Sequence, residues 1–281
     1  MRRLPVLETI RQAYGFTFAH LGAIIGVIWL PMVISTVAGF FVNQHYAAEI
    51  QAATASGNAA AAGPAVLAML FYLLAKLLLT AMMYVPVAQL ALGQRQDGAL
   101  LHFTFGALEW RMFRSLLGLL LFLAPPALLL MLVGQNVLGG GLGTAGPRLL
   151  GAELMFILLY AALVFVAVRI AALLVPVVVA GDKTALIRSW NLSAKNVWRL
   201  LGLMVGAVGP VMLVVAIVEV ALLQAGGADV AATSSQLTMA SGPNAPLIAG
   251  LEFLMAPLLI GLSVSASVFA WKALSKTDLT V

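Results

Sequence analysis

Charged side chains inside apolar runs are the groups through which this sequence could do chemistry. A charge at the centre of a membrane-spanning helix costs about 2.5–3.5 kcal/mol on insertion scales, so a chain that keeps one there uses it for packing or for function. Such charges often mark ion paths, proton relays and ligand sites. Five occur here: Lys76, Glu153, Arg169, Glu219 and Glu252.

Three of these charges fall at similar depths. Lys76 lies ten residues before a proline of its own run, Arg169 lies seven before one, and Glu252 lies five before one. At a rise of 1.5 Å per residue the spread is about 7.5 Å, so three helices can present these charges in one layer. Glu219 lies towards the outer end of its run, within reach of Lys76 or Glu252. Glu153 lies near the outer interface, where a carboxylate can reach water.

The candidate intramembrane polar cluster is therefore Lys76, Arg169, Glu219 and Glu252. Three interpretations stay open for it. The charges pair inside the bundle and fix the helix packing, or they line a polar cavity for an ion, a proton or a lipid headgroup. In the third interpretation, single side chains extend along the helix and reach water at the interface.

A second group of charges lies beside tryptophans rather than inside an apolar run. Arg188, Lys195 and Arg199 alternate with Trp190 and Trp198. Tryptophan prefers the membrane–water interface, so the segment is typical of an anchoring belt. The alternative is a specific site for an anionic lipid, built from the three basic side chains.

Signatures of enzymes and metal sites are missing from the sequence. The chain has no cysteine, and its histidines, at positions 20, 45 and 102, lack the spacing of metal ligands. No Gly-x-Ser-x-Gly elbow and no phosphate-binding loop occurs. We therefore expect no cofactor, no metal, no catalytic residue and no enzymatic activity.

Composition identifies the elements that must position these side chains. Of the 281 residues, 63% are hydrophobic and 9% are charged, and the mean hydropathy is +1.07. Soluble domains carry about 25% charged residues, so the chain is an integral membrane protein with one membrane domain, 1–281. The sequence pI near 9.8 reflects basic residues beside apolar runs, where they set topology; we expect no nucleic-acid partner.

Six apolar runs are long enough to span a bilayer, which takes about 20 residues. The fold class is thus an all-α polytopic bundle of six transmembrane helices. Amphipathic segments precede the first, third and fifth runs and are predicted to lie in the interface; in the first, Leu7, Ile10, Tyr14 and Phe18 recur at helical spacing. Asp182 is the predicted N-cap of the third. The predicted spans are 18–42, 64–93, 112–134, 149–180, 197–223 and 246–271, and the predicted interfacial helices are 5–17, 97–111 and 182–196.

Basic residues predict the orientation of the bundle. Twelve of the 15 Lys and Arg residues fall in the termini and the even-to-odd connections, and only Arg148 falls in the odd-to-even connections. Positive charge is retained in the cytoplasm. Both termini are therefore predicted to be cytoplasmic.

An internal repeat is also predicted. A His or Arg precedes a proline by eleven residues in each odd run: His20 and Pro31, Arg114 and Pro125, Arg199 and Pro210. Each even run carries a proline as well. The pattern indicates a helix pair used three times in parallel, although proline is common in membrane helices.

The stretch 166–202, VAVRIAALLVPVVVAGDKTALIRSWNLSAKNVWRLLG, carries a recognisable signature. It resembles bacterial six-span membrane proteins that include the YciC-like family and the membrane domain beside some glycerophosphodiester phosphodiesterases. The resemblance implies a bacterial inner-membrane protein and no reaction, because the catalytic barrel of those phosphodiesterases is a separate domain for which this chain has no room. The matching residues are Arg169, Pro176, Ala185, Arg188, Ser189, Trp190 and Trp198.

Function is thus only bounded by the sequence. The favoured interpretation is a non-enzymatic scaffold, regulatory or lipid-environment protein of the inner membrane. The alternative is a small transporter or lipid-handling protein with an intramembrane polar cavity. Membrane lipids are the expected partners, and a protein partner or a homo-oligomer stays open.

Overall fold

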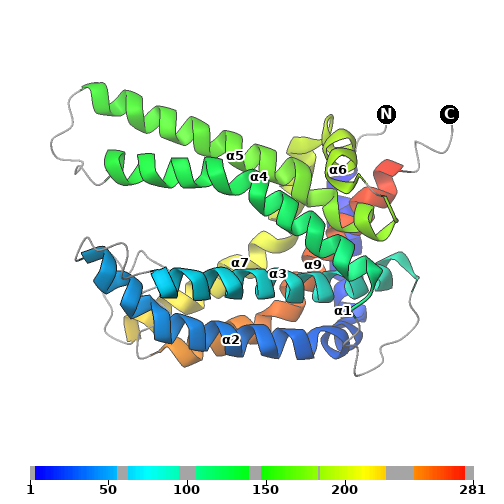
Figure 1. Ribbon diagram of the computed structural model, residues 1–281. Coiled ribbons are helices and arrows are strands. Elements are labelled where there is room, and N and C mark those ends of the chain that lie inside the picture. The colour runs from blue at the N-terminus through cyan, green and yellow to red at the C-terminus, as the bar shows by residue number, and fades with distance from the viewer. Residues whose placement is uncertain are drawn as a thin grey trace.

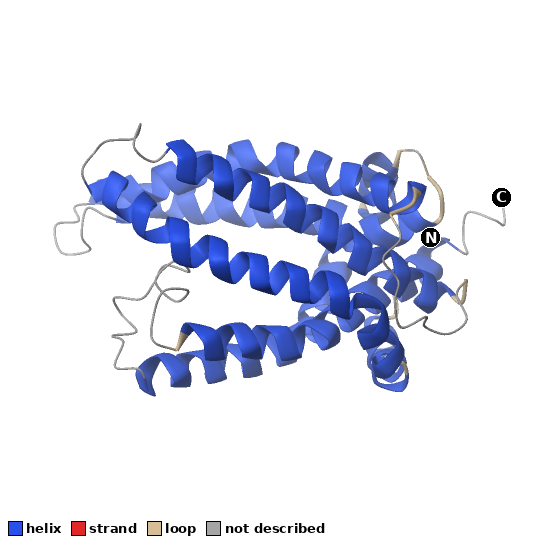
Figure 2. Ribbon diagram, turned by 60° about the horizontal axis from the view of Figure 1, so that its bottom comes forward, coloured by secondary structure: helices blue, strands red, loops and turns tan. Residues whose placement is uncertain are grey.

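Helices form every regular element of the described chain. The computed structural model describes residues 4–55, 63–94, 105–138, 147–182, 184–225 and 244–275, and no strand occurs among them (Figure 2). Two helices are short, α1 (Val6–Ala19) and α6 (Ala185–Ser193). The long ones are α2 (Leu21–Ala55), α3 (Gly63–Leu92), α4 (Ala107–Leu138), α5 (Pro147–Val179), α7 (Val197–Ala225) and α9 (Ala245–Ser275).

The six long helices confirm the predicted number of spans, because each is long and apolar enough to cross a membrane. Helices that follow one another in the chain form closely packed pairs, α2 with α3, α4 with α5, and α7 with α9. The helix of the first span, α2, runs to Ala55 rather than ending with its apolar run at residue 42. Alanine-rich sequence follows that run, and alanine is the best helix former, so nothing stops the helix there.

Two of the three predicted interfacial helices exist as separate elements. α1 matches the first prediction and α6 the third. The predicted helix at 97–111 is not separate in the described chain: 97–104 lie outside it, and Ala107–Arg111 form the first turns of α4. That start is fixed by Glu109, whose carboxylate accepts the Gly106 N–H at 2.9 Å, and neither Gly nor Pro separates Arg111 from the apolar run that follows it.

Helix α9 lies at the centre of the bundle and packs against α1, α2, α3, α5 and α7 (Figure 1). The first and last described residues lie at one end, which we call the basic end because Arg111, Arg188, Arg199 and Lys272 lie there. The core lies near this end, in the last turns of α3, α5 and α9. Towards the opposite, far end the α4–α5 pair diverges from the other helices, and its apolar side chains are exposed (Figure 1).

Helices α1 and α6 run across the long axis of the spans at the basic end (Figure 1). α1 meets α9 at Ser265, whose hydroxyl donates to the Ala13 carbonyl at 3.4 Å. α6 meets α5 at Ile170, whose carbonyl accepts from Ser189 at 2.5 Å. From the far ends of α9 and α5 to these levels is about 30–35 Å at 1.5 Å per residue, which is one hydrocarbon thickness.

The short helices turn small side chains towards the bundle. Thr9, Ala13 and Thr17 of α1 are buried, whereas Leu7 is 83% and Phe18 58% exposed. Glu8, Arg11 and Gln12 occupy a third, exposed face. α6 repeats this arrangement with buried Ala185, Ser189 and Ser193 and with Ile187 65% exposed. Each helix thus offers one face to protein, one apolar face to lipid and one polar face to water.

Helices α3 and α5, which form the second and fourth spans, end in the same way. Gly93 and Gly181 have φ of 74° and 90°, a left-handed conformation that side chains with a Cβ disfavour. In each, the glycine N–H donates to a carbonyl three residues back, and the next N–H donates five residues back.

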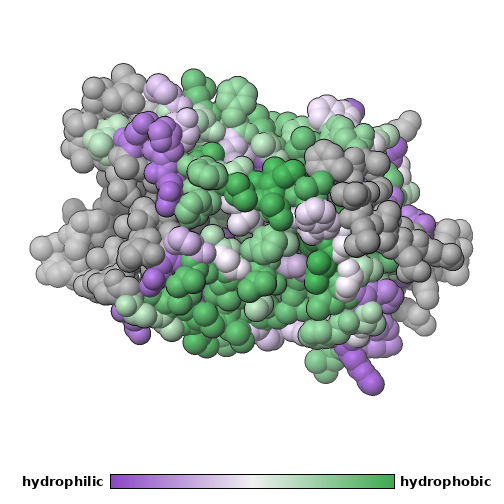
Figure 3. Space-filling view, turned by 90° about the horizontal axis from the view of Figure 1, so that it is seen from below, coloured by the Kyte–Doolittle hydropathy of each residue, from purple (hydrophilic) through white to green (hydrophobic). Residues whose placement is uncertain are grey.

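Hydrophilic residues gather towards both ends of the molecule, and an apolar band covers its middle (Figure 3).

Candidate functional site

The described residues line a cavity of about 310 Å³ among α3, α5, α7 and α9. It is partly open to the surface and almost wholly apolar. We call it the interfacial cavity, because it lies beside Ile170 and Ser265, at the level of α1 and α6. Its lining residues are Tyr84, Ala167, Val168, Ala171, Ala172, Val175, Met204, Ser263, Val264 and Ser267.

Small residues on α5 create the space. Ala167, Ala171 and Val175 recur every fourth residue and therefore share one helix face. At a given separation between helices, an alanine side chain fills less of the gap than a leucine side chain would. The facing part of α7 contributes only Met204 to the lining. The remaining wall comes from α9 and from Tyr84 of α3.

Three hydroxyls line the cavity, and each is already engaged. Tyr84 and Ser263 are hydrogen-bonded to each other, and Ser263 donates to the Ile260 carbonyl at 3.1 Å. Ser267 donates to the Ala172 carbonyl at 2.5 Å. Bound hydroxyls of this kind tie helices together and are poor nucleophiles without an adjacent base. The lining of the cavity therefore offers mainly apolar contacts.

The sequence reasoning missed these serines. Ser263, Ser265 and Ser267 alternate within an apolar run, and in a helix this spacing sends neighbours to different sides. Ser265 reaches α1, where its hydroxyl lies 3.3 Å from that of Thr17, while the other two face the cavity. Ser-x-Ser-x-Ser inside a span was a detectable signal, because hydroxyls commonly link helices in membranes.

Arg169 of α5 does not line the interfacial cavity, and its side chain is held by α6. Its guanidinium carbon is 3.6 Å from the centroid of the Trp190 ring, and its Nε donates to the Trp190 carbonyl at 3.3 Å. One turn earlier on α5, Phe165 packs against Trp198 of α7, with 5.9 Å between the ring centroids. Arg169 lies within the candidate span Leu154–Val179, at the point where α6 packs against α5.

Of the other three residues of the predicted polar cluster, Lys76 and Glu252 lie near Tyr72 in the far half of the bundle, and Glu219 lies near Glu252. The Lys76 ammonium is 6.0 Å from the centre of the Tyr72 ring. Tyr72 donates to the Ser35 carbonyl of α2 at 3.4 Å and interacts electrostatically with Glu252, which in turn interacts with Glu219. The structure thus brings together Lys76, Glu219 and Glu252 but places Arg169 elsewhere. In the described chain no ion pair joins any two of the four residues.

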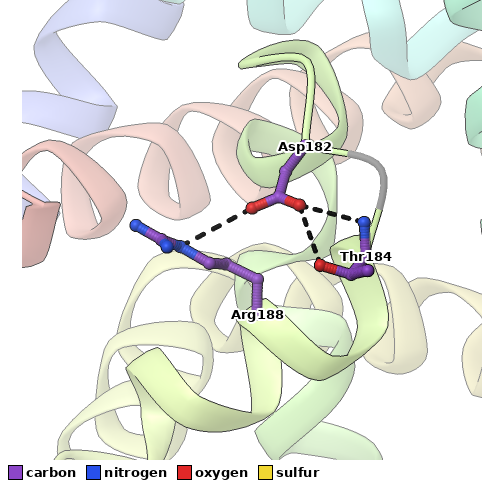
Figure 4. A network of polar contacts seen from close by, with 3 residues as sticks. All are labelled: Asp182, Thr184 and Arg188. Atoms are coloured by element: carbon purple, nitrogen blue, oxygen red, sulfur yellow. Dashed lines mark hydrogen bonds and ion pairs between the residues drawn. The ribbon is translucent and has the colours of Figure 1, made fainter.

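The residues of the predicted lipid contact are not gathered into one site. Arg199 donates to the Leu4 carbonyl at 3.2 Å and helps to hold the chain before α1, while Lys195 is exposed. Arg188 pairs with Asp182, at 3.6 Å between Nε and Oδ2 (Figure 4). Asp182 is not the N-cap that the sequence predicts; Thr184 holds that position. The side chain of Asp182 instead accepts from the Thr184 N–H at 2.9 Å and from its hydroxyl at 3.0 Å.

Acidic and histidine side chains do not form a metal centre in the described residues. The side chain of Glu153 lies outside the described part of the chain. The arrangement therefore offers an apolar cavity at one depth and a set of charges near Tyr72 at another.

The fold and these sites define an all-α, multi-pass membrane protein. Neither a scan against protein-family models, nor a search of curated proteins, nor a search of solved structures gave a match.

Proposed function

We propose that the chain is a non-enzymatic, lipid-environment protein of a bacterial inner membrane, which holds the acyl chain of a membrane lipid in the interfacial cavity. One observation carries this proposal: an apolar cavity of about 310 Å³ lies among the spanning helices α3, α5, α7 and α9 and is partly open. Lipid is the solvent at that depth, so an acyl chain is the apolar group available to fill it. The engaged hydroxyls favour binding over catalysis. The resemblance of 166–202 to YciC-like proteins supports a bacterial inner membrane.

Lipid retention tests this proposal. Ala171 lines the cavity and is exposed, so an Ala171→Phe side chain fills the space without a buried clash. The matched control is Ala162→Phe, also exposed, nine residues away and thus about 180° around α5. Purified from phosphatidylcholine nanodiscs into mild detergent, wild type and the control are expected to retain lipid by native mass spectrometry, and Ala171→Phe to retain less. Equal retention in all three proteins contradicts the proposal.

The second candidate function is transport, favoured by Lys76 and Glu252 near Tyr72 and by Glu219 near Glu252. Charges on three helices at one depth are a feature of ion and proton paths. The cavity described above touches none of them. Lys76→Ala separates the roles: a lower protein level with no change in ion or proton flux into liposomes supports packing, and a normal level with lost flux supports transport.

A further inference from the structure

We propose that the interfacial cavity selects a neutral lipid alcohol, an uncharged lipid whose hydroxyl group donates a hydrogen bond to the side chains of Tyr84 and Ser263. This proposal rests on the proposed function and names the class of lipid that the cavity holds.

One of the three lining hydroxyls, that of Ser267, has a fixed structural partner. Pro176 has no N–H, so it leaves the Ala172 carbonyl, four residues back in α5, without its usual helical donor. Ser267 of α9 donates to that carbonyl at 2.5 Å, and its side chain is buried. The proton of Ser267 therefore holds α9 against α5 and stays with the protein.

The other two hydroxyls form the polar group that a ligand can reach. Tyr84 and Ser263 are half-buried, line the cavity and are hydrogen-bonded to each other. A hydroxyl carries one proton and two acceptor lone pairs. Because Ser263 donates its proton to the Ile260 carbonyl at 3.1 Å, Tyr84 is the donor in the bond between the two side chains. Both protons are thus used within the protein, and the pair presents oxygen lone pairs to a ligand.

Charge and depth restrict the ligand further. The lining residues are all uncharged, and they lie within the candidate spans of α3, α5, α7 and α9. Arg169 is not among them, and its guanidinium stacks on Trp190 of α6. A charged group inside a span is costly unless an opposite charge pairs with it. The cavity therefore disfavours the carboxylate of a fatty acid and the phosphate of a phospholipid.

A hydroxyl is the neutral polar group that matches this lining. An ether or ester oxygen only accepts, so it binds the pair only by taking a proton that Ile260 or Ser263 already uses. The hydroxyl of a lipid alcohol donates to a lone pair of Tyr84 or Ser263 and breaks no bond within the protein. Its alkyl chain fills the apolar remainder of the cavity. Diacylglycerols and isoprenoid alcohols are two sources of such a hydroxyl in membranes.

The test uses phosphatidylcholine nanodiscs that contain equal amounts of hexadecanol and hexadecyl methyl ether, which share a chain but differ in the donor. Mass spectrometry measures the ratio of the two that the protein retains after transfer to mild detergent. We expect wild type to favour the alcohol about fivefold, which corresponds to one net hydrogen bond. In separate nanodiscs, hexadecanoic acid is expected to be retained less than hexadecanol.

Ser263→Ala is the informative variant, because it removes the acceptor of Tyr84 and frees the phenolic proton. Alcohol and ether then both accept from Tyr84, so the ratio is expected to fall to about one. Ser265→Ala is the matched control: it makes the same change two residues away on α9, but Ser265 faces α1 and does not line the cavity. This control is expected to keep the wild-type ratio.

Unfolding temperatures in phosphatidylcholine nanodiscs show which variants fold, and ratios are compared among folded variants. If Ser263→Ala does not fold, Tyr84→Phe decides, since it removes the phenolic acceptor and is expected to lower the ratio. A diacylglycerol and an isoprenoid alcohol, each paired with its own methyl ether, then replace hexadecanol. The source is the alcohol that wild type enriches over its ether, and enrichment of neither overturns the proposal.

The remaining results separate this proposal from the proposed function. Equal retention of hexadecanol and its ether by wild type, or an unchanged ratio in the folded variants of the pair, overturns the choice of a lipid alcohol and leaves lipid binding standing. Retention of hexadecanoic acid above hexadecanol shows a site for anions and overturns the neutral class. Loss of every lipid from wild type overturns both proposals.

Discussion

Individual polar side chains at the basic end of this protein mostly bind backbone groups. Arg199 and Asn196 contact the two backbone groups of Leu4, and Lys272 donates to the Ala91 carbonyl at 2.9 Å. Backbone carbonyls at helix ends lack intrahelical partners, so basic side chains satisfy them favourably. Basic residues that the sequence marks as topology signals therefore also hold helix ends in place.

Asp182 provides a pH-dependent contact at this scale. Hydrogen bonds from the backbone and the hydroxyl of Thr184, helped by the charge of Arg188, hold the pKa of Asp182 below its ordinary value. A carboxyl with a lowered pKa in the folded state stabilises the fold above its unfolded pKa, about 3.9, and this contribution is lost as pH falls through the folded value. Asp182→Ala is therefore expected to loosen the start of α6 at pH 7 but to have little effect at a pH below the lowered pKa of Asp182.

Amide hydrogen exchange measures this effect locally. The N–H of Arg188 donates to the Thr184 carbonyl at 2.9 Å in the first turn of α6 and should lose protection in the variant. We expect a cost of about 0.5–1 kcal/mol, because the carboxylate is partly exposed to solvent. Asp182→Asn keeps an acceptor for Thr184 and should lie between the two. An equal effect at pH 7 and at a pH below the lowered pKa of Asp182 would contradict the assigned role of the charge.

Helices are the scale at which the sequence is most informative. The number of spans, α1 and α6 follow from apolar runs and periodicity, which are local properties. Arg169 shows what local patterns do not contain: the sequence gives its place along α5, but not that α6 folds back onto α5 and that Trp190 stacks on the guanidinium. The groups that a side chain contacts depend on where the neighbouring helix lies, and no pattern within one apolar run specifies this. For the same reason the sequence placed Lys76 and Glu252 in one layer but did not separate Arg169 from them.

Close packing of α1 on α9 gives a prediction at the scale of elements. A Cβ on Gly261 would lie 2.7 Å from the methyl of Thr17 and 3.1 Å from Ile24. Thr17 also pairs with Ser265, so it cannot move without loss of that contact. Gly261→Leu is expected to displace α1 and to lower the free energy of unfolding by about 1–3 kcal/mol, the usual cost of overpacking.

The matched control for this substitution lies on the same helix. A Cβ on Gly250 meets nothing within 4 Å, so Gly250→Leu changes α9 without a clash. Thermal unfolding of both variants in nanodiscs gives the comparison. Similar unfolding temperatures for Gly261→Leu and wild type would show that α1 is not tightly held against α9.

The whole molecule is packed at the basic end and divergent at the far end. Helices α3, α5 and α9 bury their last turns against α1 and one another, whereas α4 and α5 expose apolar side chains towards the far end. Lipid fills such a space in a membrane, because exposed apolar groups are stable there without a protein partner. The interfacial cavity lies where the divergence closes. A bundle of this shape keeps lipid next to its one well-packed region, which is consistent with a lipid-environment function.

Orientation is the last property of the whole molecule that the structure makes testable. The chain has no cysteine, so a single introduced thiol reports its own side of the membrane. Gln12 is exposed on α1 at the basic end, and Ala225 is exposed at the far end of α7. Because basic residues are retained in the cytoplasm, we expect a membrane-impermeant maleimide to label Ala225→Cys in intact spheroplasts and Gln12→Cys only after lysis. The reverse pattern would invert the proposed topology, and labelling of both sites before lysis would contradict a span that separates them.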